Sequence, residues 1–130
     1  MIVLDASVVV EILLGGPLAA RIRQLLERGS QPWIVPHLLD VEVISALRNL
    51  AASRRIDVHR TQEFLDALAS LPVERYGHTP LLERIWDLRH NFTAYDAAYI
   101  ALAEATGSIL CTTDEKLSKG HSARVILVKA

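Results

Sequence analysis

The feature that most constrains the fold is a pair of apolar runs without polar alternation, each followed by an aspartate. The chain begins "MIVLDAS", with Asp5 directly after the run, and "SILCTTDEKL" (108–117) places Asp114 shortly after a second run. A strand that is apolar at successive positions is buried on both faces, which is typical of parallel sheets covered by helices. Both runs therefore predict inner strands of one α/β sheet.

The rest of the chain alternates between predicted helices and strands. Apolar residues at steps of three and four predict amphipathic helices over 37–54 and 58–71. Thr79 and Pro80 suit the cap and first position of another helix. Further helices are expected from Ala6, over 17–28 and over 93–107, and further strands over 32–36, 72–76 and 124–128. This order predicts a three-layer α/β sandwich, with a mostly parallel central sheet, helices on both faces, and a single domain over 1–130.

Four acidic residues are expected at one edge of this sheet. Ligands of such folds bind beyond the carboxyl ends of the strands, where Asp5 and Asp114 would both lie. Asp96 begins the helix that leads into the Asp114 strand. Glu42 lies in the first turns of the helix over 37–54, whose start faces the same edge. The four carboxylates are therefore predicted to converge on one crevice.

Each of these acids also has a structural explanation when it is taken alone. Asp5 and Asp114 suit helix N-caps, Asp96 completes a capping box with Thr93, and Glu42 suits a solvated helix face. Together they are harder to explain, because two carboxylates about 4 Å apart repel by roughly 4 kcal/mol at an effective dielectric constant of 20. A bound divalent cation removes that conflict.

The chemistry of the donors favours one class of metal. Ligands that are all oxygens suit Mg²⁺ or Mn²⁺ better than Zn²⁺. The five histidines lack the close spacing of a zinc site, and Cys111 lies within an apolar strand as a predicted core residue. An acidic magnesium site suits phosphodiester hydrolysis. Hydroxyls at Ser7, Thr112 and Thr113 could orient the attacking water or a carboxylate, and Thr112 is the favoured one.

Composition limits the alternatives further. Hydrophobic residues make up 51% of the 130 residues, but no apolar stretch reaches the length of a membrane helix. The start of the chain has no secretion signal, and a single cysteine allows no internal disulfide, so a cytoplasmic protein is expected. The formal net charge of −1 does not support a general nucleic-acid binder, although a bound cation would change the local charge.

Several segments resemble a known family. "MIVLDASVVVEILL", "DVEVISALR", "FTAYDAAYIALAEATGSILCTTDEKL" and the terminal strand resemble a PIN-domain ribonuclease, and more narrowly a VapC-type toxin of a prokaryotic toxin–antitoxin pair. The resemblance covers essentially the whole chain. It implies that Asp5, Glu42, Asp96 and Asp114 bind Mg²⁺ or Mn²⁺ for catalysis, and that Thr112 is the hydroxyl residue that precedes the last acid.

The resemblance also implies a function and partners. Members of this family cut RNA, often a tRNA or ribosomal RNA, and thereby stop translation. They commonly form homodimers and are silenced by a cognate VapB-type antitoxin, whose C-terminal arm wraps the helices and reaches the active-site groove. We therefore expect a magnesium-dependent endoribonuclease toxin of a type II toxin–antitoxin system.

The residues themselves say less about partners. The leucine- and alanine-rich helices over 37–54 and 58–71 could form an interface, or could simply pack on the sheet and on each other. Trp33 and Trp86 could stack on bases, although a core position is favoured for Trp33. The basic residues that could hold phosphates, or could simply be solvated, are Arg48, Arg54, Arg55, Arg84 and Arg89.

Other functions remain open at this point. A signalling receiver domain needs two acids after the first strand, but "LDAS" has one. A phosphatase with an aspartyl nucleophile needs Asp-x-Asp, and Ser7 occupies the second position. A non-catalytic binding module leaves the acids unexplained. A PIN enzyme that cuts DNA or processes RNA has the same residues, because the metal site does not choose the sugar.

Overall fold

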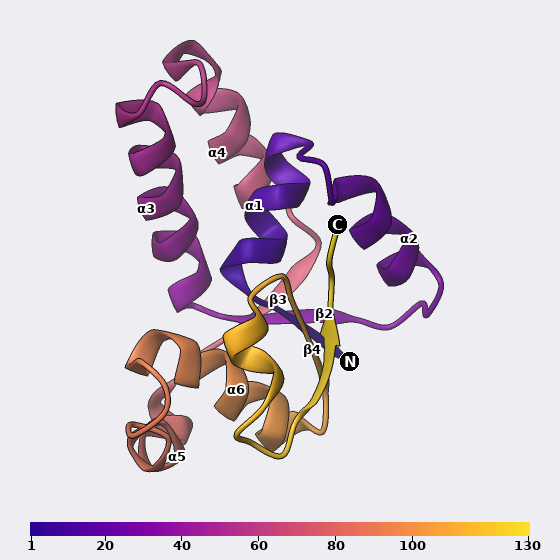
Figure 1. Ribbon diagram of the computed structural model, residues 1–130, viewed down its shortest axis with the longest axis vertical. Coiled ribbons are helices and arrows are strands. Elements are labelled where there is room, and N and C mark those ends of the chain that lie inside the picture. The colour runs from indigo at the N-terminus through magenta and orange to yellow at the C-terminus, as the bar shows by residue number, and fades with distance from the viewer.

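Five strands form one sheet in which every neighbouring pair is parallel. The computed structural model describes residues 1–130 (Figure 1). The strands follow the order β3-β2-β1-β4-β5 across the sheet. Their bounds are β1 Ile2–Leu4, β2 Trp33–Pro36, β3 Val73–Tyr76, β4 Ile109–Thr112 and β5 Arg124–Leu127. Each run that was predicted to be a strand forms one, and the sheet is entirely parallel.

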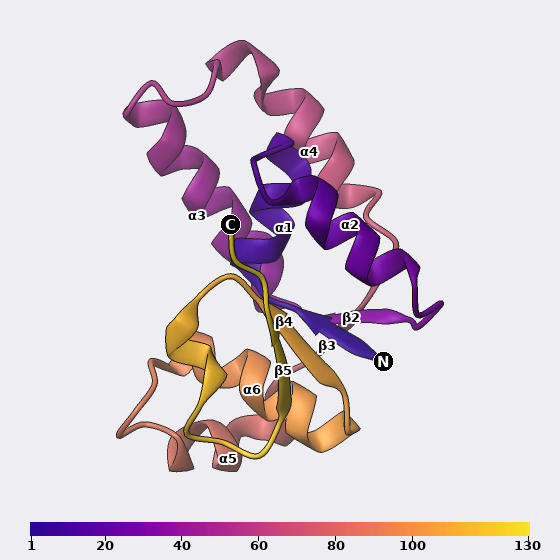
Figure 2. The ribbon, with the colours of Figure 1, turned by 45° about the vertical axis from the view of Figure 1, so that its right-hand side comes forward.

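Helices cover both faces of this sheet (Figures 1 and 2). Four lie on one side: α1 Ala6–Leu14, α2 Ala19–Glu27, α3 Leu38–Ala52 and α4 Thr61–Ala69. Two lie on the other side: α5 Leu82–Asp87 and α6 Ala94–Thr106. Short 3₁₀ turns occupy Val58–Arg60, Thr79–Leu81 and Glu115–Ser118. The predicted three-layer α/β sandwich is confirmed. None of the helices combines the length and the apolar character that a membrane span requires.

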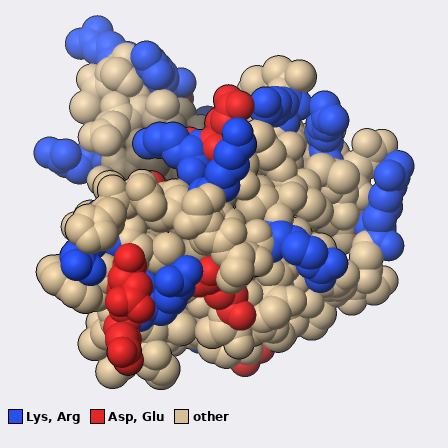
Figure 3. All heavy atoms as spheres, turned by 60° about the horizontal axis from the view of Figure 1, so that its bottom comes forward, with Lys and Arg blue, Asp and Glu red and all other residues tan.

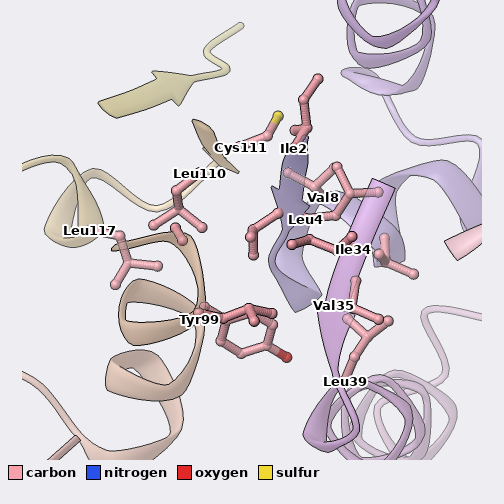
Figure 4. Packing of buried hydrophobic residues seen from close by; sticks show 14 of the residues in the cluster. Ile2, Leu4, Val8, Ile34, Val35, Leu39, Tyr99, Leu110, Cys111 and Leu117 are labelled. Carbon is pink, nitrogen blue, oxygen red and sulfur yellow. The ribbon is translucent and has the colours of Figure 1, made fainter. Parts of the chain in front are cut away.

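The core lies on the two central strands and the helices that flank them. Residues 97–103 of α6 are all buried, and the alanines among them allow the helix to lie close to β1, β2 and β4. Figure 4 shows Leu4, Ile34 and Leu110 packed together between the layers. Cys111 is buried as predicted, and burial raises the pKa of its thiol to about 12, so this cysteine is unreactive.

The helix ends agree with the sequence signals in most places. Thr93 caps α6 by accepting a hydrogen bond from the Asp96 N–H at 3.1 Å, and Gly107 ends α6 in the left-handed conformation. The prediction that Thr79 caps a helix is wrong. The chain tightens there into a 3₁₀ turn, in which the Leu81 N–H bonds to the His78 carbonyl at 2.8 Å, and α5 begins only at Leu82.

The strand order places a topological switch point at the middle of the sheet. From β1 the chain continues to β2 and β3 on one side, whereas β4 and β5 lie on the other side. The direction of winding therefore reverses between β1 and β4. In open parallel sheets, ligands bind beyond the carboxyl ends of the strands at such a switch point.

Candidate metal centre

Asp5 follows β1 directly and is held in a single orientation. It is only 4% exposed, and both of its carboxylate oxygens accept hydrogen bonds. Oδ1 accepts from the Val8 N–H at 3.1 Å and from the Ser7 hydroxyl at 2.6 Å. Oδ2 accepts a short hydrogen bond from the Thr112 hydroxyl. Asp5 is therefore both the predicted cap of α1 and a fixed carboxylate at the switch point.

Thr112 connects the ends of the two central strands. Its side chain is fully buried, and its Oγ1 donates to Asp5 while it accepts from the Asp114 N–H at 2.9 Å. Thr113 contributes a backbone N–H, which donates to the Ser7 hydroxyl at 3.1 Å. The Thr112 hydroxyl therefore fixes Asp5 and the backbone that carries Asp114 relative to each other.

Asp114 lies beside Asp5 at the end of β4. Its Oδ1 accepts from the Lys116 N–H at 3.0 Å and so caps the following 3₁₀ turn. Its Oδ2 lies 3.8 Å from the Lys116 ammonium, a loose ion pair that is mostly exposed. The charge of Asp114 reaches Asp5, where it adds to the effect of burial in raising the pKa of that carboxyl.

Asp96 and Glu42 lie on helices that cover opposite faces of the sheet, and the charge of Asp96 reaches Glu42. Asp96 lies in the first turn of α6 and Glu42 lies early in α3, and both are partly buried. Burial, and then the negative charge of Asp114, raise the pKa of Asp96. Burial, and then the charges of Asp96 and Asp5, raise the pKa of Glu42. The pKa values of Asp5, Glu42 and Asp96 are therefore each raised in part by the charge of another of the four acids.

Glu42 has a buried oxygen without a partner. Its Oε1 has no hydrogen-bond partner. The nearby Tyr99 hydroxyl also has none, although Tyr99 is only 1% exposed. The two groups are close enough that Glu42, after burial, raises the pKa of Tyr99, and that Tyr99 lowers the pKa of Glu42. Figure 4 shows the Tyr99 hydroxyl pointing away from α6. A buried carboxylate oxygen without a partner is costly, and a cation would satisfy it.

The donor set fits a hard divalent cation. It consists of carboxylate oxygens supported by hydroxyls, without sulfur or imidazole donors, which suits Mg²⁺ or Mn²⁺. As the side chains stand, no three acidic, histidine or cysteine side chains form a group that could hold a metal ion. Binding would therefore require the less constrained carboxylates, Glu42, Asp96 and Asp114, to turn toward the fixed carboxylate of Asp5.

Comparisons with known proteins identify the family of this chain. The family profile named PIN domain matches residues 2–120. Ribonuclease VapC1 of Mycobacterium tuberculosis is 45% identical over 118 residues, which cover 89% of this chain and 87% of the relative. Ribonuclease VapC12 of the same organism is 41% identical over 130 residues, which cover 98% and 99% of the two chains. The chain belongs to the VapC group of the PIN-domain family.

Solved structures share this PIN-domain fold. A toxin–antitoxin complex from Klebsiella pneumoniae matches with a TM-score of 0.68 and 19% identity, covering 97% of this chain and 96% of that one. VapC20 of Mycobacterium tuberculosis, described as a toxin that cleaves the sarcin-ricin loop, matches with a TM-score of 0.68 and 17% identity, covering 91% and 93%. At these identities the likeness establishes the fold, which confirms the predicted PIN-like sandwich.

The predicted basic residues of this PIN domain fall into two groups. Arg84 is paired with Glu104 through two hydrogen bonds of 2.7 and 3.0 Å, and Arg89 lies 4.2 Å above the ring of Trp86. Their side chains are therefore already engaged. The other three are exposed and make no ion pair or side-chain hydrogen bond: Arg48, Arg54 and Arg55.

The sequence predicts the position of Trp33 but overlooks a buried tyrosine close to Glu42. Trp33 packs against the core as favoured, although it remains partly accessible, and Trp86 is exposed. Tyr99 was not predicted as part of the site. A signal for it exists, because Tyr99 lies three residues after Asp96 and so shares its helix face, and it carries the one hydroxyl in an otherwise apolar buried segment.

Proposed function

We propose that this chain is a divalent-metal-dependent endoribonuclease that acts as the toxin of a type II toxin–antitoxin pair. The observation that supports the proposal is the Thr112 hydroxyl, which links the Asp5 carboxylate to the backbone of Asp114 at the switch point. Asp96 and Glu42 lie close enough to the other acids that the charges of those acids add to burial in raising their pKa values. The names of the VapC relatives support ribonuclease activity. The acids have no comparable role in a non-catalytic binding module.

Three carboxylates are proposed as the direct metal ligands. Asp5, Asp96 and Asp114 would hold Mg²⁺ or Mn²⁺, and Glu42 would complete the site directly or through water. When bound, such a cation neutralises charge on a phosphodiester and lowers the pKa of water. The like charges that raise the pKa of Asp96 and Glu42 would then be balanced.

The residues of the chain itself supply positioning and a proton acceptor. The Ser7 and Thr112 hydroxyls hold the Asp5 carboxylate in one orientation, so little reorganisation is needed when the substrate binds. Glu42 Oε1 is a buried acceptor without a partner, which suits a group that takes a proton from the attacking water. Water would then attack the RNA phosphodiester in line with the leaving oxygen.

Transfer RNA or ribosomal RNA is the proposed substrate, and inhibition of translation is the proposed consequence. A structural neighbour is described as cleaving the sarcin-ricin loop, a ribosomal RNA element, which supports this class of substrate. Because these RNAs are cytoplasmic, we propose that residues 1–130 act there as a single nuclease domain. A PIN nuclease that cuts DNA or processes RNA is the second candidate.

Two protein partners are proposed. A cognate VapB-type antitoxin is supported by the structural neighbour described as a toxin–antitoxin complex. A second copy of the chain is supported by exposed apolar side chains on α3 and α5, beside an apolar groove of about 430 Å³. The exposed residues are Val41, Ile44, Leu82 and Trp86. A symmetric dimer would bury this surface in both copies.

The experiment that tests the function is cleavage of end-labelled tRNA and ribosomal RNA fragments by the purified, antitoxin-free protein. Reactions would contain Mg²⁺ or a chelator, and Asp96→Asn would serve as the variant, because the amide keeps the shape of the side chain without its charge. Discrete cuts that require both Mg²⁺ and Asp96 are expected. Cuts that survive chelation or the Asp96→Asn change would overturn the proposal, and cutting of DNA alone would favour the second candidate.

A further inference from the structure

His121 lies in the loop between β4 and β5 and uses both of its ring nitrogens. Nε2 lies 2.7 Å from the carbonyl oxygen of Leu117, and Nδ1 lies 3.1 Å from the backbone nitrogen of Ala123. A carbonyl oxygen can only accept and a backbone N–H can only donate, so Nε2 carries the hydrogen and Nδ1 is the acceptor. The side chain is partly buried, and these two bonds hold it in one orientation.

The carbonyl that accepts from His121 belongs to the 3₁₀ turn that begins after Asp114. The Asp114 carboxylate caps this turn by accepting from the Lys116 N–H at 3.0 Å, and the Asp114 carbonyl accepts from the Leu117 N–H at 3.1 Å. Leu117 is 1% exposed, so the turn is also packed into the core. His121 therefore fixes the end of the same turn whose cap supplies a carboxylate to the proposed metal centre.

The same loop packs against Phe92, which lies just before α6. The ring centroids of His121 and Phe92 are 6.0 Å apart, and the rings are tilted by 57°. Gly120 has a φ of +91°, and a Cβ at this position would lie 3.2 Å from the Phe92 ring, so the backbone of the loop approaches that ring closely. The first turn of α6 carries Asp96. Phe92 and His121 therefore connect the two segments that carry Asp96 and Asp114.

The ion pairs of the loop are weaker constraints on Asp114. Its pair with Lys116 spans 3.8 Å, and the pair of Glu115 with Lys129 spans 3.6 Å. Both pairs are mostly exposed, and exposed ion pairs contribute little. Figure 3 shows acidic and basic side chains scattered over the face that carries the loop, so no patch of one charge surrounds it. The hydrogen bond from His121 is therefore the better-defined constraint on the turn.

We propose that His121 is a positioning residue of the metal centre: by holding the Leu117 carbonyl, it fixes the turn that orients the Asp114 carboxylate toward the other acids. This role rests on the proposed metal-dependent function, and it belongs to a side chain that touches neither metal nor substrate. A carboxylate that is already oriented loses less conformational freedom when a cation binds. The bond to Leu117 carries the effect, because the bond from Ala123 does not reach the turn that Asp114 caps.

Three variants of His121 separate its two hydrogen bonds, with Mn²⁺ affinity measured by calorimetry. His121→Gln places an amide N–H near the position of Nε2 and can still bond to the Leu117 carbonyl. His121→Asn places an amide oxygen near Nδ1 and can still accept from Ala123, and His121→Phe keeps only the ring that packs on Phe92. The Gln variant should retain the wild-type affinity, and the Asn and Phe variants should lose about fivefold, somewhat less than the loss of a direct partner of a metal ligand causes. Equal affinities of the Gln and Asn variants would overturn the proposal.

Ser122 provides a matched control in the same loop. Its N–H and its hydroxyl donate to Glu104 Oε2 at 3.0 and 2.7 Å, which ties the loop to α6 and not to the turn. Ser122→Ala removes the bond from the hydroxyl and should leave the Mn²⁺ affinity unchanged. A loss as large as that of His121→Phe would show that the loop acts only through its general rigidity.

A double-mutant cycle tests whether His121 acts through Asp114. In the Asp114→Asn background, His121→Phe should cause no further loss of Mn²⁺ affinity, whereas in the Asp96→Asn background the loss of about fivefold should persist. A similar loss in both backgrounds would mean that His121 does not act through Asp114.

Hydrogen exchange of the metal-free protein gives a readout that needs neither metal nor RNA. The Leu117 amide should exchange faster in His121→Phe than in the wild type, and His121→Gln should restore its protection. Exchange that is the same in all three proteins would refute the hold on the turn. Wild-type protein that binds no Mn²⁺ would contradict the metal centre itself, whereas tight binding that His121→Phe does not change would overturn only the role of His121.

Discussion

The Glu42 carboxylate and the Tyr99 hydroxyl lie close together inside the protein, and neither Glu42 Oε1 nor the Tyr99 oxygen has a hydrogen-bond partner of normal geometry. The two residues belong to α3 and α6, which cover opposite faces of the sheet. They meet only where both helices begin, at the carboxyl edge. A polar pair of this kind is unfavourable on its own and becomes favourable when a cation or substrate engages the carboxylate.

Removing the Tyr99 hydroxyl should weaken the metal site without unfolding the protein. Tyr99→Phe keeps the buried ring, so the free energy of unfolding should change by less than about 1 kcal/mol. The pKa of Glu42 should rise further, because Tyr99 lowers it. Mn²⁺ affinity, measured by calorimetry, should fall several-fold. Tyr95→Phe makes the same chemical change on the exposed side of the same helix and should leave Mn²⁺ affinity unchanged; equal effects of the two variants would contradict this role.

Thr112 should matter for both stability and activity. Thr112→Val keeps the shape of the side chain but leaves the Asp5 carboxylate and the Asp114 N–H without a shared hydroxyl. The loss should be about 2 kcal/mol in urea unfolding, because a buried charged group loses a partner. Thr112→Ser should retain most of the stability. A valine variant as stable as the wild type would show that the Thr112 hydroxyl does not fix Asp5.

The acids should destabilise the protein when no cation is present. Burial and neighbouring charge raise the pKa of Asp96 in the folded state, so the folded protein binds more protons than the unfolded chain and loses stability as pH rises through the ordinary pKa. In chelator at pH 7, Asp96→Asn should therefore be more stable than the wild type. Adding Mg²⁺ at 100 times its Kd should stabilise the wild type by about 2.7 kcal/mol and the variant by less. Thermal unfolding with and without chelator measures both effects.

The opposite dependence on pH is expected for Glu104, far from the metal centre. Arg84, and then Ser122, lower the pKa of Glu104 from 4.5 to about 2. This carboxylate therefore stabilises the fold above pH 4.5, and that stability is lost as pH falls toward 2. Its side chain is 11% exposed but Arg84 is 43% exposed, so about 1 kcal/mol is expected. Glu104→Gln should be less stable than the wild type at pH 7 and equally stable near pH 2; a constant difference would contradict the assignment.

Much of the fold follows from the sequence because the three inner strands, β2, β1 and β4, are short and almost entirely apolar. The apolar side chains of a run such as "MIVL" leave water only when both faces of the strand are buried, and a parallel sheet covered by helices provides this burial. The positions of Asp5 and Asp114 at one edge of the sheet then follow from the shared direction of the strands that precede them. The positions of Asp96 and Glu42 follow from the helices that carry them, because both helices begin at the same edge.

Other features depend on contacts that no local pattern encodes. Thr112 and Asp5 are 107 positions apart, and which hydroxyl reaches the carboxylate is decided by the register of β1 on β4. The pairing of Arg84 with Glu104 likewise results from the packing of α5 on α6 and removes Arg84 from the candidates for phosphate binding. The Thr79-Pro80 pair predicts a helix cap, whereas the chain forms a 3₁₀ turn over Thr79–Leu81.

The most direct test of a shared cation site is a calorimetric Mn²⁺ titration of the wild type and of four variants, Asp5→Asn, Glu42→Gln, Asp96→Asn and Asp114→Asn. Glu104→Gln serves as the control, because it removes one carboxylate away from the crevice. Saturable binding by the wild type is predicted, with the affinity reduced about tenfold or more by each of the four changes and unaffected by the control. Folded wild-type protein that binds no Mn²⁺, or four variants that bind like the control, would contradict a shared cation site.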